Sequence, residues 1–236
     1  MKTETIYGIR PVVEALRSGR RNVFEVVDAV GDVNVAKAAD ARSVDVKRAS
    51  RQRVEDLVPG VIHQGIVARV EPYPYSGVEE ILSTREPLVL VLDGVTDPRN
   101  LGAVLRAADG TGASGVVIPK DRAAGVTAAA VKASAGASEH VRVARETNLR
   151  RAIDTMKRAG LWVFAAESGG PPYTELDLAG PVGLVFGSEG RGVRRLVSEG
   201  CDGTISIPML GAVGSLNVSV ASAVLLYEAR RGRGWP

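Results

Sequence analysis

From residue 88 onward, short runs that are apolar throughout alternate with longer segments of helical spacing. A strand at a protein surface alternates apolar and polar residues, whereas a strand buried on both faces of a parallel sheet is apolar along its length. The pattern therefore predicts an α/β domain with a doubly wound parallel sheet. The expected strands are LVLVLD (88–93), GVVIP (115–119), LWVFAAE (161–167), VGLVFG (182–187) and TISIP (204–208), and the expected helices are 100–109, 127–135, 147–159, 192–199 and 216–231.

In a sheet of this kind, ligands bind in the loops beyond the carboxyl ends of the strands. The loops that matter for function are therefore those that follow Asp93, Glu167, Gly187 and Pro208. Residues that carry chemistry are expected in these loops rather than at the opposite edge of the sheet.

A segment rich in proline, residues 72–87 (PYPYSGVEEILSTREP), precedes this domain. Its prolines and glycine interrupt regular structure, so it predicts a linker with at most a short helix in its middle. The linker separates a first domain, residues 1–71, from a second, residues 88–236. Val-rich strands at 23–30 and 65–72 with helices between them indicate that the first domain is a small α/β unit.

Composition excludes several classes of protein. Cys201 is the one cysteine in 236 residues, which excludes an intrachain disulfide and is typical of a reducing compartment. With His63 and His140 as the two histidines, a Cys/His metal site is not expected. No secretory signal is evident, and no apolar run approaches the ~18 residues of a membrane span. We therefore expect a cytoplasmic protein that binds neither a metal nor a membrane.

The net charge of +3 allows an anionic partner without requiring one. Because aromatic residues make up only 4% of the chain, base stacking is not expected to be the main way of holding nucleic acid. A basic cluster, Lys47, Arg48, Arg51 and Arg53, could contact phosphates. The common alternative for such a cluster is a solvated surface.

The first motif is LDGVTDPRNLGAVLRAAD (92–109), in which a strand ends at Asp93 and a helix opens near Asn100. Asn100 either caps this helix or lies at the mouth of a site. Arg106 has apolar neighbours, so we expect a largely enclosed helix in which its guanidinium needs an anionic or carbonyl partner. The alternative for Arg106 is an ordinary surface charge.

The second motif is VFGSEGRGV (185–193), where a strand runs into a turn that contains three glycines and Glu189. Glycine allows a close approach of the backbone to other groups and a positive φ angle. An ordinary turn does not need three glycines, so the motif predicts a turn built for close packing, with the carboxylate of Glu189 held in place.

The third motif is ISIPMLGAVGSLNVSVASAVLLYEARR (205–231). A Gly-rich loop leads to Ser215 and Asn217, which either cap the following helix or take part in a site. The first turns of that helix are small or apolar on several faces, so it must be packed on more than one side. It is therefore a candidate subunit interface as well as a core element.

Taken together, the order and separation of these motifs resemble the SpoU/TrmH-type SPOUT methyltransferases over essentially the whole chain. The segments YGIRPVVEAL near the start, HQGIVA (63–68) and KASAGASEHVRVARETNL (132–149) are most similar to the RlmB-like branch. The family moves a methyl group from S-adenosylmethionine to a ribose 2′-hydroxyl of RNA, and this branch acts on a guanosine of 23S ribosomal RNA. The resemblance implies a deep trefoil knot in the second domain, a ribosomal-protein-like RNA-binding fold in the first, and a homodimer through the knot domain.

The resemblance also assigns roles to residues. It places Asn100, Arg106, Glu189, Ser215 and Asn217 in the catalytic site, and Ala166, Gly187, Ile207, Met209 and Leu216 at the cofactor. The RNA contacts would be Lys47, Arg48, Arg51, His63 and Gln64, although a lone histidine is more often structural.

The family's proposed base matches Arg106, but a guanidinium with a pKa above about 12 is a poor base. We therefore expect Arg106 to contact a phosphate or the 2′-oxygen and to stabilise negative charge there. Glu189 would orient Arg106 or Asn100, or take the proton itself.

Three alternative functions differ in how well they agree with the sequence. The same chemistry on transfer RNA, or on another ribosomal site, is compatible with every motif. A non-catalytic RNA-binding protein on the same scaffold would not bind S-adenosylmethionine. A nicotinamide-dependent reductase is excluded because GTGASG (110–115) follows a helix and precedes a strand, the reverse of the order that dinucleotide binding needs.

Overall fold

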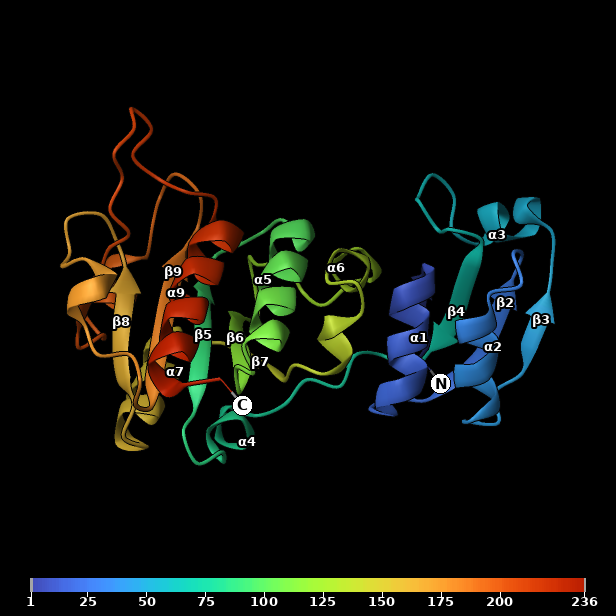
Figure 1. Ribbon diagram of the computed structural model, residues 1–236, viewed down its shortest axis with the longest axis horizontal. Coiled ribbons are helices and arrows are strands. Elements are labelled where there is room, and N and C mark those ends of the chain that lie inside the picture. The colour runs from blue at the N-terminus through green and yellow to red at the C-terminus, as the bar shows by residue number, and fades with distance from the viewer. Residues whose placement is uncertain (1, 236) are drawn as a thin grey trace.

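The N-terminal domain is a mixed four-stranded sheet covered by short helices (Figure 1). In the computed structural model, which describes residues 2–235, its elements are β1 (Glu4–Tyr7), α1 (Ile9–Ser18), β2 (Val23–Asp28), α2 (Val33–Asp40), β3 (Val46–Arg48), α3 (Arg51–Leu57) and β4 (Ile66–Val70). The strand order is β1-β4-β2-β3, with β4 antiparallel to both of its neighbours and β3 parallel to β2. The expected small α/β unit is confirmed, with β1 as an edge strand that the sequence pattern did not reveal.

The C-terminal domain is built on six parallel strands in the order β10-β8-β9-β5-β6-β7. Its elements, with α4 in the segment between the domains, are α4 (Val78–Leu82), β5 (Leu88–Asp93), α5 (Pro98–Gly110), β6 (Gly115–Pro119), α6 (Ala128–Ala133), η1 (Ala137–Glu139), β7 (Val143–Glu146), α7 (Leu149–Arg158), β8 (Trp162–Ala166), η2 (Tyr173–Glu175), β9 (Val182–Gly187), α8 (Arg195–Ser198), β10 (Gly203–Ile205) and α9 (Val218–Arg233).

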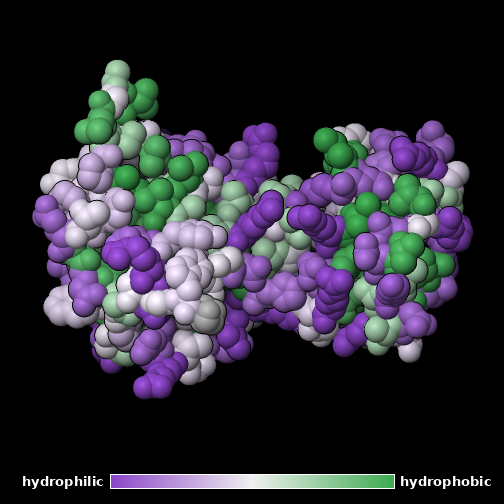
Figure 2. Space-filling view, in the orientation of Figure 1, coloured by the Kyte–Doolittle hydropathy of each residue, from purple (hydrophilic) through white to green (hydrophobic). Residues whose placement is uncertain are grey.

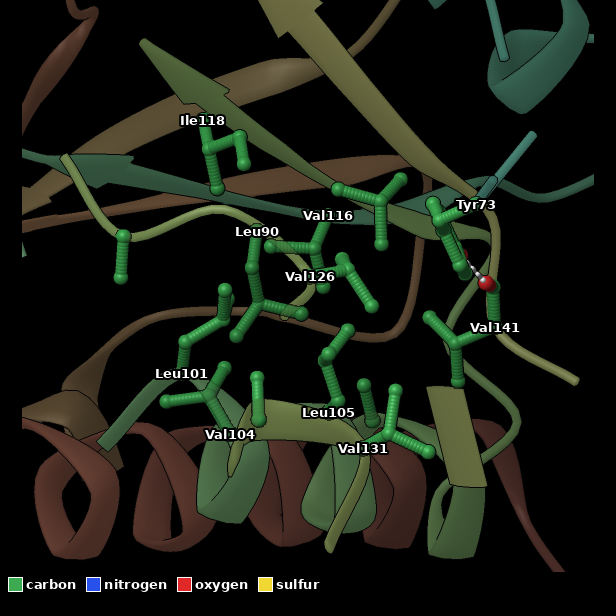
Figure 3. Close-up of a cluster of buried hydrophobic side chains, with 14 of the residues drawn as sticks. Tyr73, Leu90, Leu101, Val104, Leu105, Val116, Ile118, Val126, Val131 and Val141 are labelled. Carbon is green, nitrogen blue, oxygen red and sulfur yellow. Dashed lines mark hydrogen bonds between the residues drawn. The ribbon is translucent and has the colours of Figure 1, made fainter. Parts of the chain in front are cut away.

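Helices cover both faces of this sheet, which explains why its strands lack polar alternation. In β5, Leu90 points toward α5 and α9, while Val89 and Val91 belong to a second cluster on the face that α7 covers. Figure 3 shows Leu90 beside the neighbouring strand residue Val116 and above Leu101 of α5. The doubly wound parallel sheet predicted from the apolar runs is confirmed.

The order of the strands reverses between β5 and β9. From β5 the chain proceeds to β6 and β7 on one side, whereas β8 and β10 lie on the other side of β9. Asp93 and Gly187 are register partners at the carboxyl ends of these two central strands. A reversal of this kind opens a crevice at the carboxyl edge, so the loops that carry the motifs emerge at the place where a ligand site is expected.

Some predicted boundaries were wrong for identifiable reasons. Helix α5 begins at Pro98, because Asp97 rather than Asn100 caps it by accepting a hydrogen bond from the Arg99 N–H at 2.8 Å. Helix α8 covers only four residues, because the preceding residues form the glycine turn. Strand β10 ends at Ile205. Strand β7 was not predicted, because it is short and half-exposed at the sheet edge.

Among residues 2–235, no helix is both long and apolar enough to cross a membrane. In the same range, no group of three or more His, Cys, Asp or Glu side chains is arranged to hold a metal ion.

Cys201 follows α8 and is partly buried, and its Sγ lies 3.5 Å from the Val197 carbonyl oxygen. Burial, with a smaller contribution from the nearby Asp202 carboxylate, raises the pKa of this thiol to about 12. Because the thiolate is the nucleophile, we expect native protein at pH 8 to react with iodoacetamide at least about a hundredfold more slowly than an unperturbed cysteine. Mass spectrometry of the alkylated protein measures the rate, with the guanidinium-unfolded chain as the reactive control. Equal rates in the two states would contradict the prediction.

Candidate active site

A cavity of 830 Å³ lies at the carboxyl edge of the C-terminal sheet, among the loops after β8, β9 and β10 and the start of α9. It collects residues that are far apart in the sequence. All five expected cofactor contacts and three of the expected catalytic residues line it: Ala166, Gly187, Ile207, Met209, Leu216, Glu189, Ser215 and Asn217. The loops that follow β8, β9 and β10 therefore share one site.

The glycine turn after β9 forms one wall of the cavity by doubling back on itself. A Cβ atom on Gly187 would overlap the backbone of Gly192 and Val193. The Gly192 N–H donates a hydrogen bond to the Ser188 carbonyl oxygen at 3.0 Å. Gly190 and Gly192 have φ angles of 80° and 66°, which L side chains rarely adopt. Each glycine of the motif thus has its own steric or conformational reason.

Three side chains from the three motifs form one hydrogen-bond cluster at the mouth of this cavity. The Glu189 Oε1 atom accepts from Asn100 Nδ2 at 3.0 Å and from Asn217 Nδ2 at 2.8 Å. Asn217 Nδ2 also lies 3.1 Å from Asn100 Oδ1. Asn217 caps α9, because its Oδ1 accepts from the Ser219 N–H at 2.9 Å. Capping fixes the orientation of the amide, so the amide N–H groups point toward the carboxylate.

A buried carboxylate holds the far end of the glycine turn. The Asp93 side chain is 0% exposed and lies 2.7 Å from Arg194 Nη2. Its second oxygen accepts from the Arg194 backbone N–H at 2.8 Å. Neither residue was among the expected site residues. The sequence feature that could have indicated Asp93 is its charge, because it ends a strand that is otherwise apolar. Asp93 thereby ties β5 to the loop that carries Glu189.

We expect Asp93→Asn to destabilise the fold by about 1.5–3 kcal/mol, because it removes the charge of a buried carboxylate that accepts charge-assisted hydrogen bonds from Arg194. The loop that carries Glu189 should loosen as well, so affinity for a ligand in the cavity should fall. Urea unfolding and ligand titration measure the two effects. Asp154→Asn, which alters an exposed ion pair with Arg150 on α7, is the matched control. If both variants show wild-type stability, Asp93 does not anchor the loop.

Arg106 does not join this cluster, and the expectation that it is enclosed was wrong. It is exposed, because it falls on the side of α5 opposite the buried stripe that contains Val104 and Leu105. It lines a separate cavity of 540 Å³ between α5 and α1 of the N-terminal domain, together with Arg10 and Arg17. Arg106 thus faces the space between the two domains.

Ser215 lines the main cavity, but Asn217 rather than Ser215 caps α9. Ser215 lies in the loop between β10 and α9, which stands out from the domain in Figure 1. The tip of this projection is apolar in Figure 2, and its Leu210 and Val213 are exposed. An exposed apolar loop beside a cavity is a candidate contact surface.

The basic cluster of the N-terminal domain is partly neutralised by its own neighbours. Lys47 Nζ lies 2.7 Å from the Glu25 carboxylate, and this pairing raises the pKa of Lys47. Arg48 lies 3.2 Å from the buried carboxylate of Asp28. Arg51 and Arg53 are exposed on α3. The two arginines on α3 are therefore more available to an anionic ligand than the pair on β3.

His63 and Gln64 make structural contacts in the turn before β4. His63 Nε2 lies 3.0 Å from the Glu55 carboxylate, and Nδ1 accepts from the Gly65 N–H at 2.9 Å. Gln64 Oε1 accepts from the Ile9 N–H at 3.3 Å and lies 2.5 Å from Lys132 Nζ of α6. The imidazole and the amide oxygen are thus occupied within the chain, and Gln64 joins the two domains.

Two family descriptions match the chain. Residues 87–227 match the SpoU rRNA Methylase family, and residues 5–76 match RNA 2′-O ribose methyltransferase substrate binding. The 23S rRNA (guanosine-2′-O-)-methyltransferase RlmB of Photorhabdus laumondii is 42% identical over 242 residues, covering 98% of this chain and 99% of the relative. The Escherichia coli K12 protein of the same name is 40% identical over 98% of this chain and 99% of its own.

Solved structures give the same result. The AdoMet-bound rRNA methyltransferase from Sinorhizobium meliloti has a TM-score of 0.83 and 28% identity, covering 97% of this chain and 87% of that one. The SpoU methyltransferase AviRb from Streptomyces viridochromogenes, in complex with AdoMet, has a TM-score of 0.83 and 26% identity, covering 98% and 90%. The resemblance inferred from the motifs is confirmed, and the chain belongs to the SpoU rRNA methylase family.

Proposed function

We propose that this protein transfers a methyl group from S-adenosylmethionine to the ribose 2′-hydroxyl of a guanosine in 23S ribosomal RNA. The single observation that carries the proposal is that the second and third motifs line one cavity, and that Asn100 of the first motif is hydrogen-bonded to Glu189 and Asn217 at its mouth. The names of full-length relatives at about 40% identity support the substrate. Solved relatives with bound AdoMet support the cofactor.

The cavity suits S-adenosylmethionine. Ile207, Met209 and Leu216 give it an apolar lining, and the glycine turn brings backbone groups to its wall without side chains in between. Its volume of 830 Å³ is in the usual range for sites that take a ligand of this size. When bound, the cofactor supplies an electrophilic methyl group on a sulfonium. Ala166, Gly187, Ile207, Met209 and Leu216 would hold it.

Within this proposal, Glu189 accepts the proton that the 2′-hydroxyl loses as it attacks. Its carboxylate is held by two amide N–H donors, so it is fixed at the mouth of the cavity and needs no rearrangement. Asn100 and Asn217 orient it, and Ser215 helps to position the ribose. Arg106, facing the interdomain space, binds an RNA phosphate and stabilises negative charge there.

We assign the RNA substrate-binding role to residues 1–71 and methyl transfer to residues 88–236, joined by 72–87. The substrate-binding family match over residues 5–76 supports this division. Among the expected RNA contacts, Arg51 has an exposed, charged side chain that makes no ion pair within residues 2–235. It would bind the RNA phosphate backbone together with Lys47 and Arg48 on β3. Because its substrate is made where ribosomes assemble, we assign the enzyme to the cytoplasm.

We also propose the ribosomal-protein-like fold for the first domain and, for the second, a trefoil knot formed by residues 185–193 and 205–231. The knot domain would carry the homodimer interface. In support, Val220 and Tyr227 of α9 are about half exposed, and the adjacent loop presents Leu210 and Val213. Apolar surface of this kind is usually covered by a partner.

Mass-spectrometric mapping of ribose methylation, on 23S RNA from cells with and without the protein, tests the proposal. One guanosine should lose its 2′-O-methyl group when the protein is absent and regain it with purified protein and S-adenosylmethionine. Methylation of a transfer RNA or of another ribosomal site instead would show that the proposed reaction is right and the proposed substrate is wrong. Calorimetry that detects no binding of S-adenosylmethionine would instead indicate a non-catalytic RNA-binding protein.

A further inference from the structure

The two domains are joined by an ion pair that is buried on both sides. Arg21, just before β2, has a side chain 1% exposed, and Glu139, the last residue of η1, has one 0% exposed. Arg21 Nε donates to Glu139 Oε2 at 3.1 Å and Nη2 donates to Oε1 at 2.5 Å. Arg21 Nη1 also donates to the Glu71 carbonyl oxygen at 3.1 Å. The guanidinium thus meets the carboxylate through two parallel hydrogen bonds, from one domain to the other.

The preceding residue extends this contact into the segment between the domains. Arg20 Nη1 donates to the Val141 carbonyl oxygen at 2.6 Å, and Nη2 donates to Ser76 Oγ at 3.1 Å. Tyr73 is 5% exposed, and its hydroxyl lies 2.9 Å from the same Val141 oxygen (Figure 3). The Ser76 N–H donates to the Val143 carbonyl oxygen at 2.9 Å. The start of the predicted linker is therefore packed rather than free.

The other hydrogen bonds and ion pairs between the domains lie at the rim of the interface. Lys132 binds Gln64, and His140 Nε2 lies 2.9 Å from the Glu14 carboxylate. These groups are open to solvent, so water can replace either partner when the contact opens. The Glu139 carboxylate, which is fully buried, has no such replacement while the surrounding interface stays closed.

A buried ion pair is a poor source of stability, because removing both charges from water offsets most of their attraction. A buried ion pair does, however, fix the relative orientation of the two elements that carry it. A guanidinium fork satisfies a carboxylate bidentately in one relative orientation. A sliding or rotated interface would leave the buried Glu139 carboxylate without its partner, while Arg21 would keep only its 3.3 Å contact with the partly exposed Glu4 carboxylate of its own domain. Intermediate domain orientations are therefore strongly disfavoured.

We infer that the Arg21–Glu139 pair is a positioning device that fixes the RNA-binding domain relative to the cavity, so that the enzyme accepts RNA only when its binding element and target ribose lie at one separation. This inference rests on the proposed function. Neither side chain lines the cavity, so both act through domain placement and not on the reacting atoms.

The double variant Arg21→Met/Glu139→Leu tests this role. Apolar residues of similar volume commonly preserve stability at such sites, so the fold should persist while the geometric requirement is lost. Amide hydrogen exchange of residues 72–77 and 134–142 should become at least about tenfold faster. The surface pair variant Arg150→Met/Asp154→Leu, on α7, is the matched control and should leave exchange in both segments unchanged.

Steady-state kinetics on an unmodified 23S RNA transcript then separates positioning from a general loss of structure. We expect KM for RNA to rise about tenfold, with kcat and the Kd for S-adenosylmethionine changed less than about twofold. On a minimal fragment around the mapped nucleotide, inserting base pairs between that nucleotide and the rest of the footprint should abolish wild-type methylation. The double variant should tolerate the insertion better.

The inference is overturned if, in the double variant, amide hydrogen exchange is as slow as in the wild type and the inserted base pairs abolish methylation as they do in the wild type. If the double variant does not fold, the same measurements are made on Arg21→Lys, which keeps the charge but loses the fork, and the same pair of unchanged results would overturn the inference. If the wild-type protein fails to methylate the transcript, the proposed function fails. The exchange measurement still decides whether the pair fixes the domains.

Discussion

Gly187→Ala is expected to weaken cofactor binding strongly. The added Cβ would overlap the backbone of Gly192 and the amide nitrogen of Val193, and backbone atoms cannot swing aside as a flexible side chain can. The φ angle of Gly187 is not positive, so the effect is steric and not conformational. Relief requires the turn to move away from β9, which opens the wall of the cavity and separates Glu189 from Asn100 and Asn217.

We expect the Kd for S-adenosylmethionine to rise at least about a hundredfold, equivalent to about 2.7 kcal/mol, with methylation lost. Overpacking of this kind also lowers the free energy of unfolding by about 1–3 kcal/mol, so thermal unfolding must be measured beside the calorimetric titration. Gly180→Ala, before the opposite end of β9, is the matched control, because no heavy atom lies within 4 Å of its Cβ position. Wild-type affinity in Gly187→Ala would show that the turn can relax without disturbing the site.

The parallel sheet was predictable because burial on both faces leaves a signature in each strand separately. LVLVLD needs no knowledge of its neighbours to be identified as an interior strand, and all six of its residues are buried. The glycine turn was predictable for a similar reason, since three glycines around one carboxylate are not needed in an ordinary turn. Strands β1 and β7 left no such signature, because short, half-exposed edge strands are compatible with many structures.

Contacts between distant residues could not be predicted from the chain alone. Asp93 and Arg194 are 101 positions apart, and no feature of the sequence near either residue indicates that the two side chains pair. The same is true of Arg21 and Glu139, which are 118 positions apart. The expected enclosure of Arg106 was wrong because apolar neighbours in the sequence do not imply burial, since a helix can bury one stripe and expose the next residue.

Glu189→Gln is expected to lower kcat by about a hundredfold or more, the usual contribution of a positioned proton acceptor. Glutamine is close to isosteric, and its amide oxygen can still accept from Asn100 and Asn217, so the cluster can be preserved. What is lost is the negative charge and the capacity to take a proton. The Kd for S-adenosylmethionine should therefore stay within about threefold of wild type.

This variant distinguishes two roles for Glu189. If the carboxylate only orients the two asparagines, glutamine should suffice and kcat should stay near wild type, while Glu189→Ala, which leaves both amides without their acceptor, should lose activity. If the carboxylate accepts the proton, Gln and Ala should be similarly inactive. Glu199→Gln, in an exposed ion pair with Arg195 after α8, is the control for loss of one carboxylate. We expect the second outcome, because both amide donors already converge on one carboxylate oxygen, Oε1, and its partner Oε2 is left to receive the proton.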